Sequence, residues 1–452
     1  MSDERHMTGG RRLDPSEAFH ASIDWAGNYS AVCEGTVDAE ALGRAFTVLS
    51  AAAPLLRGRL IRDDEGFRFE VAERPRAEFT VRGGGEAAYR EEMVRRLDSS
   101  RSLARLTLVT EEGSRHHGGG SRDREENSRH HGEGARHHVI LTVHHAIADA
   151  GVGIALFARL WEIYTATVTA APVTAAPIPG AATALPTSAE RLLIARGAGR
   201  ADGYGPGWDD DAGAVSRALS AAAGAFELPA SEVARTRLDR DTTRRLTESV
   251  SGLGLSLHGF LCGAVLVACR DELREESGPT RLVCGSPVDL RAWLSPPVGP
   301  FEATNFVAGI EFPVTVPESA DPLVVAQDAT EGLDAAIAAI VPERVLLDSR
   351  RFSGSAVEVV DYAVSNIGRI PGLATPEGLA VTDFRGYTST TVPGMPLFLV
   401  SVYDGRLSVE LISAAGLLTA DRRTRVVERL GDILRSVPGP GIAKTAGKAI
   451  RD

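Results

Sequence analysis

One stretch near the first third of this 452-residue chain constrains its fold more than any other. Residues 139–143 form an apolar, β-branched run that is typical of a buried strand. His144 and His145 follow it directly, and Asp149 stands where apolar residues begin to recur at helical spacing. A strand that leads through a short loop into a helix is common where helices cover a sheet, so this stretch predicts an α/β architecture.

The two adjacent histidines are candidates for catalysis. Neighbouring strand residues point to opposite faces, so only one of His144 and His145 can face a given cleft while the other packs inward. Imidazole has the side-chain pKa nearest to neutral pH, which suits general-base chemistry on a hydroxyl. A single histidine at a strand end is more often a satisfied core residue, but two in a row before Asp149 are rarer. Asp149 can also cap the following helix and hold the loop rigid.

Length and charge limit the classes of protein to consider. A chain of 452 residues is too long for one compact core and suits two domains of roughly 200 residues each. The net charge of −11 argues against a nucleic-acid binder or a polybasic membrane-surface protein, since phosphate would repel both. The four scattered cysteines indicate buried thiols in a reducing compartment. With no secretory signal and no run of roughly 18 apolar residues, a cytoplasmic protein without a transmembrane segment is expected.

Strands and helices interleave in both halves, which predicts an α/β (α+β) class with two lobes. We expect residues 1–185 to form an N-terminal lobe that carries the histidine pair, and residues 186–452 to form a C-terminal lobe. Residues 170–187 are rich in Ala, Pro and Thr and predict an extended linker between the lobes.

Residues 113–138 form a segment rich in histidine and almost without apolar side chains, which predicts a disordered loop. It holds six of the eleven histidines in three His-His pairs, so capture of a metal ion is one interpretation. A repeat-expanded surface loop is the favoured one, because no cysteine or carboxylate stands at ligand spacing. We therefore expect no metal site.

The order of motifs resembles the HHxxxDG acyltransferase superfamily, which includes nonribosomal-peptide condensation domains, chloramphenicol acetyltransferase and carnitine acyltransferases. The likeness is greatest to the polyketide-associated Pap acyltransferases, a group that includes phthiocerol/phthiodiolone dimycocerosyl transferases. The resemblance implies two chloramphenicol-acetyltransferase-like lobes, each a mixed sheet covered by helices, with an active-site cleft or tunnel between them. It rests on the histidine motif and on strings in the expected order at residues 13–17, 53–59, 257–264, 285–291, 299–305 and 365–368.

The resemblance also assigns roles to the residues of the motif. His145 would be the general base that takes the proton of the acceptor, and His144 would pack inward. Asp149 would be structural, pairing with an arginine of the second lobe and orienting the loop. Arg291 stands at the place of that arginine, after a strand and a Pro-containing turn. The alternative interpretation of Arg291 is an ordinary surface charge.

Other positions match the family less closely. The family has glycine directly after the aspartate, whereas Ala150 here precedes Gly151. Glycine there allows close approach of a pantetheine arm, so Ala150 could narrow that approach. Residues 383–386 match the family's DFGWG motif weakly, and Asp383 is taken as structural. Ser365 and Asn366 would end a strand and help to hold an oxyanion, or alternatively form a strand cap and turn.

The function implied by the resemblance is that of a stand-alone acyltransferase. It would move an acyl group from a thioester to a hydroxyl of a polyketide, lipid-like or other secondary metabolite, with no bound cofactor and no covalent intermediate. The donor would be acyl-CoA or an acyl-phosphopantetheinyl carrier protein, the acceptor a small molecule, and the enzyme a monomer.

Two other functions stay open. One is an amide-forming condensation enzyme with an amine acceptor. The other is a non-catalytic scaffold or binding protein of the same fold, against which His145 and Asp149 at motif spacing argue.

Overall fold

The computed structural model describes residues 7–72, 78–111, 136–172, 186–197, 208–223, 230–273, 278–340, 346–348, 360–389 and 394–437. Residues 113–135 of the predicted disordered loop and residues 173–185 of the predicted linker lie outside these ranges.

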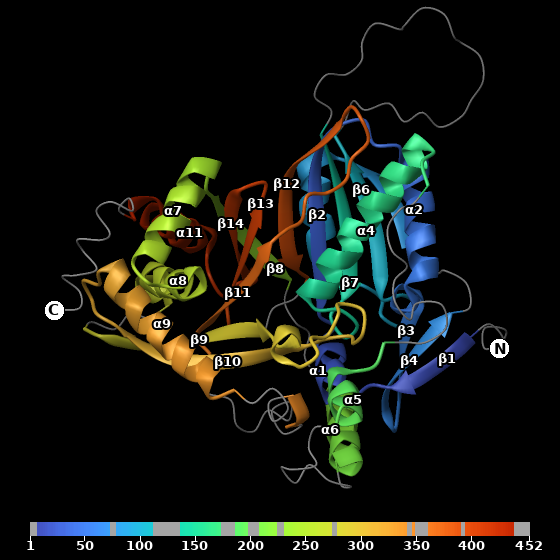
Figure 1. Ribbon diagram of the computed structural model, residues 1–452, viewed down its shortest axis with the longest axis horizontal. Coiled ribbons are helices and arrows are strands. Elements are labelled where there is room, and N and C mark those ends of the chain that lie inside the picture. The colour runs from blue at the N-terminus through green and yellow to red at the C-terminus, as the bar shows by residue number, and fades with distance from the viewer. Residues whose placement is uncertain are drawn as a thin grey trace, which may run out of the picture.

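The described residues form a mixed α/β fold built on two large sheets, which confirms the predicted class (Figure 1). A small third sheet joins β1 (Met7–Arg12), β4 (Gly66–Ala72) and β3 (Gly58–Asp63). The N-terminal sheet has the order β12 (Leu379–Thr388), β2 (Ala26–Gly35), β7 (Arg136–His144), β6 (Ala104–Thr110) and β5 (Glu78–Gly83). The C-terminal sheet has the order β10 (Val307–Val316), β9 (Thr280–Asp289), β11 (Tyr362–Arg369), β13 (Leu397–Tyr403), β14 (Arg406–Ala414) and β8 (Ser231–Arg237).

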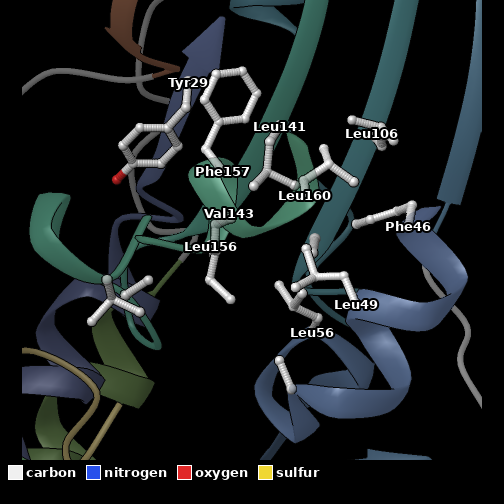
Figure 2. Packing of buried hydrophobic residues seen from close by; sticks show 14 of the residues in the cluster. Tyr29, Phe46, Leu49, Leu56, Leu106, Leu141, Val143, Leu156, Phe157 and Leu160 are labelled. Atoms are coloured by element: carbon white, nitrogen blue, oxygen red, sulfur yellow. The ribbon is translucent and has the colours of Figure 1, made fainter. Parts of the chain in front are cut away.

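Helices cover both large sheets because each presents one apolar stripe to the strands. α2 (Ala39–Ala52) begins at Asp38, whose carboxylate accepts the Ala41 N–H, and it buries the apolar positions predicted from its helical spacing. It packs with α4 (Ala150–Thr169) against β7, and Figure 2 shows the leucine and phenylalanine side chains of this core. α3 (Gly85–Val94) lies on the opposite face. The C-terminal sheet is covered by α7 (Arg240–Gly252), α8 (Leu257–Leu273), α9 (Pro322–Ala338) and α11 (Ala420–Ser436).

Within the described ranges, no single helix is both long enough and hydrophobic enough to cross a membrane. Only α7 and α8 taken together, with a bend of 104° between them, pass the same length and composition test.

β7 begins earlier than the sequence predicted. Residues 136–138 were assigned to the disordered loop, but they pair with β2 and β6 as part of the strand. His138 is buried there, stacked on Tyr89 with ring centroids 4.3 Å apart. Burial, assisted by nearby Arg385, lowers the pKa of His138 to about 4, so the ring is neutral and fits an apolar site. Because α3 and β12 supply these contacts from elsewhere in the chain, the local composition could not reveal them.

The two lobes are not consecutive in sequence. The sequence assigned all of residues 186–452 to the second lobe, whereas β12 from that stretch pairs antiparallel with β2 of the first, from Leu379 opposite Gly35 to Thr388 opposite Gly27. α6 (Trp208–Ala222) likewise packs against α1 (Pro15–Ser22) and β4. The second half of the chain thus completes the first lobe.

Buried charges around α1 provide another tie between the lobes. Both terminal nitrogens of Arg11 bond the Glu17 carboxylate at 2.6 Å, and the Thr304 hydroxyl donates to it from the second lobe at 2.6 Å. Asp14 accepts bonds from Ser188 and from Arg191. These contacts satisfy two of the three carboxylates that are buried at this place.

Glu190, the third carboxylate, has less compensation. It lies in the first turn of the short α5 (Ala189–Ala195), is 0% exposed, and accepts the Ser16 N–H at 2.9 Å through Oε1, while Oε2 has no hydrogen-bond partner. Desolvation, followed by the negative charges of Asp14 and Glu17, raises the pKa of Glu190 to about 7. The folded protein therefore retains a proton on Glu190 that the unfolded chain loses near pH 4.5.

When folding raises the pKa of a carboxyl group, the protein loses stability as the pH rises from the pKa of the unfolded chain to that of the folded protein. Above pH 7 the full cost of burying the ionised Glu190 side chain is present. We expect Glu190→Gln to raise the free energy of unfolding at pH 8.5 by on the order of 1–3 kcal/mol, and to change it little at pH 5. Urea unfolding at both pH values measures this, with exposed Glu40→Gln as the control. Equal gains at the two pH values would contradict the assignment.

Candidate active site

The two histidines of the motif occupy different environments at the end of β7. His144 is completely buried; its Nδ1 accepts the Ala146 N–H at 3.1 Å and its Nε2 lies 3.3 Å from the Asp24 carboxylate. His145 follows the strand, and its backbone N–H donates to the Trp25 carbonyl at 2.6 Å. Its side chain is half-buried. His144 is therefore the inward-packed member of the pair, and His145 is the partly exposed one.

The His145 ring lies among aromatic side chains. It stacks on His20 of α1, with centroids 4.4 Å apart and planes 20° from parallel, and it contacts the Trp25 ring at 5.1 Å. Desolvation lowers the pKa of His145, against the opposing effect of the Asp149 charge. A neutral imidazole results at pH 7, which has a lone pair available to accept a proton.

Asp149 is held by three groups. Its Oδ1 accepts the Val152 N–H at 3.0 Å, which makes it the N-cap of α4. Its Oδ2 accepts the Phe306 N–H at 2.8 Å and lies 2.5 Å from Nη1 of Arg291. The side chain is 0% exposed, so these partners replace its entire hydration.

Arg291 reaches Asp149 from the other lobe. It begins the short 3-10 turn Arg291–Trp293 that follows β9, it is buried, and its guanidinium lies over the Phe306 ring. Asp289 adds a second carboxylate at 3.2 Å, and burial raises the pKa of Asp289 while Arg291 opposes that shift. The geometry fits the predicted interlobe pair and not an ordinary surface charge.

Three residues of the site carried no role in the sequence interpretation. Asn305, in the loop before β10, places its Nδ2 3.0 Å from His145 Nδ1. His20 and Trp25 flank the same ring. Asn305 lies within the 299–305 string that contributed to the resemblance, but its spacing from the histidines is 160 residues, so no local pattern connects them.

Ala150 replaces the family glycine without requiring an unusual backbone. It is the first residue of α4, and it is not among the described non-glycine residues with positive φ. Gly151 is the more confined position, since a Cβ there would lie 3.3 Å from Asp149 Oδ1 and 3.5 Å from Asp289 Oδ2. Gly153 is more confined still, because a Cβ would lie 2.0 Å from the Tyr29 ring. At the start of α4, close packing therefore restricts Gly151 and Gly153, the second and fourth residues of the helix.

Ser365 and Asn366 lie inside β11 and not at its end, since the strand continues to Arg369. Asn366 Oδ1 accepts the Gly368 N–H at 3.0 Å, next to an irregularity in the pairing with β13. No contact between these two residues and His145 is present in the described part of the chain. A local turn-stabilising role for Asn366 matches this geometry better than an oxyanion site does.

Asp383 belongs to a separate ion cluster. It pairs with Arg235 through two bonds of 2.5 and 3.0 Å, and Arg237 and Arg385 lie nearby at 3.3 and 3.4 Å. Its contacts link β12 to β8, which is consistent with the structural role expected of it.

A cavity of about 660 Å³ lies between the lobes, bounded by α3, β8, β12, β14 and α11. Tyr387 lines it, and Tyr387 is opposite Asn28, which is opposite Thr142 on β7. Thr142 precedes His144 by two residues, so the cavity wall lies on the face of the sheet to which His144 points, and His145 is not among the residues that line the cavity. Buried Glu410 also lines it, and burial raises the pKa of Glu410 to about 7 although Arg235 opposes the shift.

A metal-binding cluster of three or more His, Cys, Asp or Glu side chains does not occur among the residues whose placement is described. All four cysteines are buried and free of disulfides.

Comparisons with known proteins found a matching family model and several similar transferases. Residues 228–412 match the family model described as the phthiocerol/phthiodiolone dimycocerosyl transferase C-terminus. The phthiocerol/phthiodiolone dimycocerosyl transferase of Mycobacterium bovis (strain BCG / Pasteur 1173P2) is 26% identical over 427 residues, covering 88% of this chain and 91% of that protein.

Two solved structures share the fold. Polyketide synthase associated protein 5 from Mycobacterium tuberculosis has a TM-score of 0.69 at 24% identity, covering 95% of this chain and 97% of that one. The first condensation domain of the calcium-dependent antibiotic synthetase, in complex with a substrate analogue, has a TM-score of 0.63 at 17% identity, covering 97% and 98%. The resemblance to the Pap acyltransferases is confirmed, and the condensation domain shares the fold.

Removal of one member of the interlobe ion pair should destabilise the fold. We expect Asp149→Ala to lower the free energy of unfolding by about 3–5 kcal/mol, because Arg291 keeps its buried charge without this partner and α4 loses its cap. Urea unfolding measures the change. Glu40→Ala, which breaks the exposed pair with Arg44, is the matched control and should change stability little. An Asp149→Ala protein as stable as the wild type would show that the pair does not hold the lobes together.

Proposed function

We propose that this acyltransferase, a member of the HHxxxDG superfamily with similarity to the Pap enzymes, transfers an acyl group from a thioester to a hydroxyl with His145 as the general base. The observation that carries the proposal is the position of His145 at the junction of the lobes. The ring is half-buried with a lowered pKa, and the loop that bears it is fixed by the Asp149–Arg291 pair.

The chemistry follows from the neutral ring. His145 accepts the proton of the acceptor hydroxyl as the oxygen attacks the thioester carbonyl. The tetrahedral intermediate collapses, the carbon–sulfur bond breaks, and the imidazolium returns its proton to the departing thiolate. General-base assistance of this kind contributes about 10²–10⁴ in rate. Since Asn305 occupies the Nδ1 side of the ring, Nε2 is the nitrogen left for the substrate.

The acceptor class is proposed from the relatives and from the cavity. The matched relatives are named phthiocerol/phthiodiolone dimycocerosyl transferases, and this name supports a lipid-like or polyketide acceptor. The interlobe cavity of about 660 Å³ falls within the range of small-molecule sites, roughly 300–1,000 Å³. Its walls include the apolar side chains of Met93, Val94, Val233 and Val427 beside charged groups. We assign the non-reacting part of a substrate to it.

The donor is proposed to be acyl-CoA or an acyl group on a phosphopantetheinyl carrier protein. Both present the same thioester to His145, so the mechanism does not depend on which of the two delivers it.

Removal of the imidazole should abolish turnover without unfolding the protein. We expect His145→Ala to reduce acceptor-dependent thiol release by about 10²–10⁴. The assay uses a panel of acyl-CoAs and acyl carrier proteins with a long-chain alcohol. His258→Gln, in the second lobe where His258 bonds Ser286, is the control and should keep activity. Equal release by wild type and His145→Ala would remove His145 from its assigned role.

The pH profile should report the neutral state of the base. A general base is active when deprotonated, so kcat/KM rises as pH passes upward through the pKa of His145. Because burial lowers that pKa below 6.5, we expect the acid limb of kcat/KM to be centred below pH 6.5. Initial rates from pH 4.5 to 8.5 test this, with preincubation at each pH to exclude unfolding. A limb centred above 6.5 would contradict the effect of burial.

A further inference from the structure

The side-chain amide of Asn305 is in hydrogen-bond contact with the His145 ring. Asn305 is 3% exposed and comes from the second lobe, whereas His145 belongs to the first. Its Nδ2 lies 3.0 Å from His145 Nδ1 and donates to the His145 carbonyl at 3.3 Å. A buried side chain that contacts both the ring and the backbone of one residue restricts how that ring can turn.

The orientation of the amide is determined by a third contact. The Val307 N–H donates to Asn305 Oδ1 at 3.1 Å, and a backbone N–H cannot accept, so the carbonyl end of the amide faces Val307. Nδ2, which is only a donor, therefore faces the ring, and Nδ1 must be the acceptor. In a neutral ring with Nδ1 as acceptor, the proton is on Nε2.

This arrangement opposes the protonation state that a base requires. Nε2 can accept the substrate proton only when the ring's own proton is on Nδ1. The His145 carbonyl accepts from the same Asn305 Nδ2. Asn305 thus favours the tautomer that cannot accept a proton at Nε2.

The turn that carries Asn305 also holds the rest of the site. Phe306 N–H donates to Asp149, and the Thr304 hydroxyl donates to Glu17. Three consecutive residues of the second lobe therefore contact three carboxylate or imidazole groups of the first. The position of the Asn305 amide is coupled to how the lobes meet.

From these contacts we propose that Asn305 is a positioning residue that sets the tautomer of His145, holding the resting ring with its proton on Nε2. The inference rests on the proposed function only for its kinetic consequence. The base-active tautomer forms when the amide turns over or withdraws and Nδ1 takes the proton. Besides Asn305, the titratable groups around the ring are His20 on α1, His144 on β7, and Asp149 at the N-cap of α4, which Arg291 neutralises.

Nuclear magnetic resonance of ¹⁵N-histidine-labelled full-length protein tests the tautomer without any substrate. The His145 signals are assigned by their loss in His145→Gln. We expect Nδ1 to be unprotonated in the wild type at pH 7.5 and protonated in Asn305→Asp, because a carboxylate accepts where the amide donates. The same tautomer in both proteins would overturn the proposal. Failure of the proposed acyl transfer would leave this readout unchanged, so the two hypotheses can fail separately.

Kinetics then distinguish positioning from a merely structural role. We expect Asn305→Asp to move the acid limb of kcat/KM upward by about 1–3 pH units, because an adjacent carboxylate stabilises the imidazolium. Asn305→Ala, which removes the donor that opposes the base-active tautomer, should not lower kcat and should leave KM and the acid limb nearly unchanged. An unshifted limb in Asn305→Asp, in a protein whose melting temperature matches the wild type, would show that Asn305 only joins the lobes.

Discussion

The Asp149–Arg291 ion pair is the interaction on which the rest of the site depends. It joins the start of α4 in one lobe to the end of β9 in the other, and both side chains are buried. Charges removed from water in this way stabilise a fold only when they are fully paired, so either partner alone is strongly unfavourable. The Val152 and Phe306 N–H groups complete the coordination of Asp149, and they bring the loop that carries His145 to one fixed position.

The same pair explains why His145 stays neutral although an aspartate stands four residues away. A free carboxylate beside an imidazole would stabilise the imidazolium and raise its pKa. Here the Asp149 charge is compensated by Arg291 and by two N–H donors, so desolvation among aromatic rings prevails and the pKa of His145 falls. Neutralising the aspartate thus provides both a rigid loop and a neutral His145 ring.

Local order along the chain made part of this arrangement predictable. Residues 139–151 contain the strand, the histidines, the cap and the helix start in sequence, and the family resemblance supplied Arg291. Asn305, His20 and Trp25 could not be assigned roles, because their importance arises only when distant segments meet. The strand pairing of β12 with β2, and the burial of His138 against Tyr89, depend on tertiary contacts in the same way. Composition alone gave the opposite answer for residues 136–138.

The lobes are joined at several places. β12 continues the sheet of the first lobe, Thr304 bonds Glu17, and Arg291 pairs with Asp149. Because these ties come from more than one segment of the chain, the space between the lobes is set by the fold and does not need a substrate to form it. Under the proposed function, groups that the fold already holds in place spare the reaction the entropy of assembling them. The proposed reactants must then fit a space that exists before they bind.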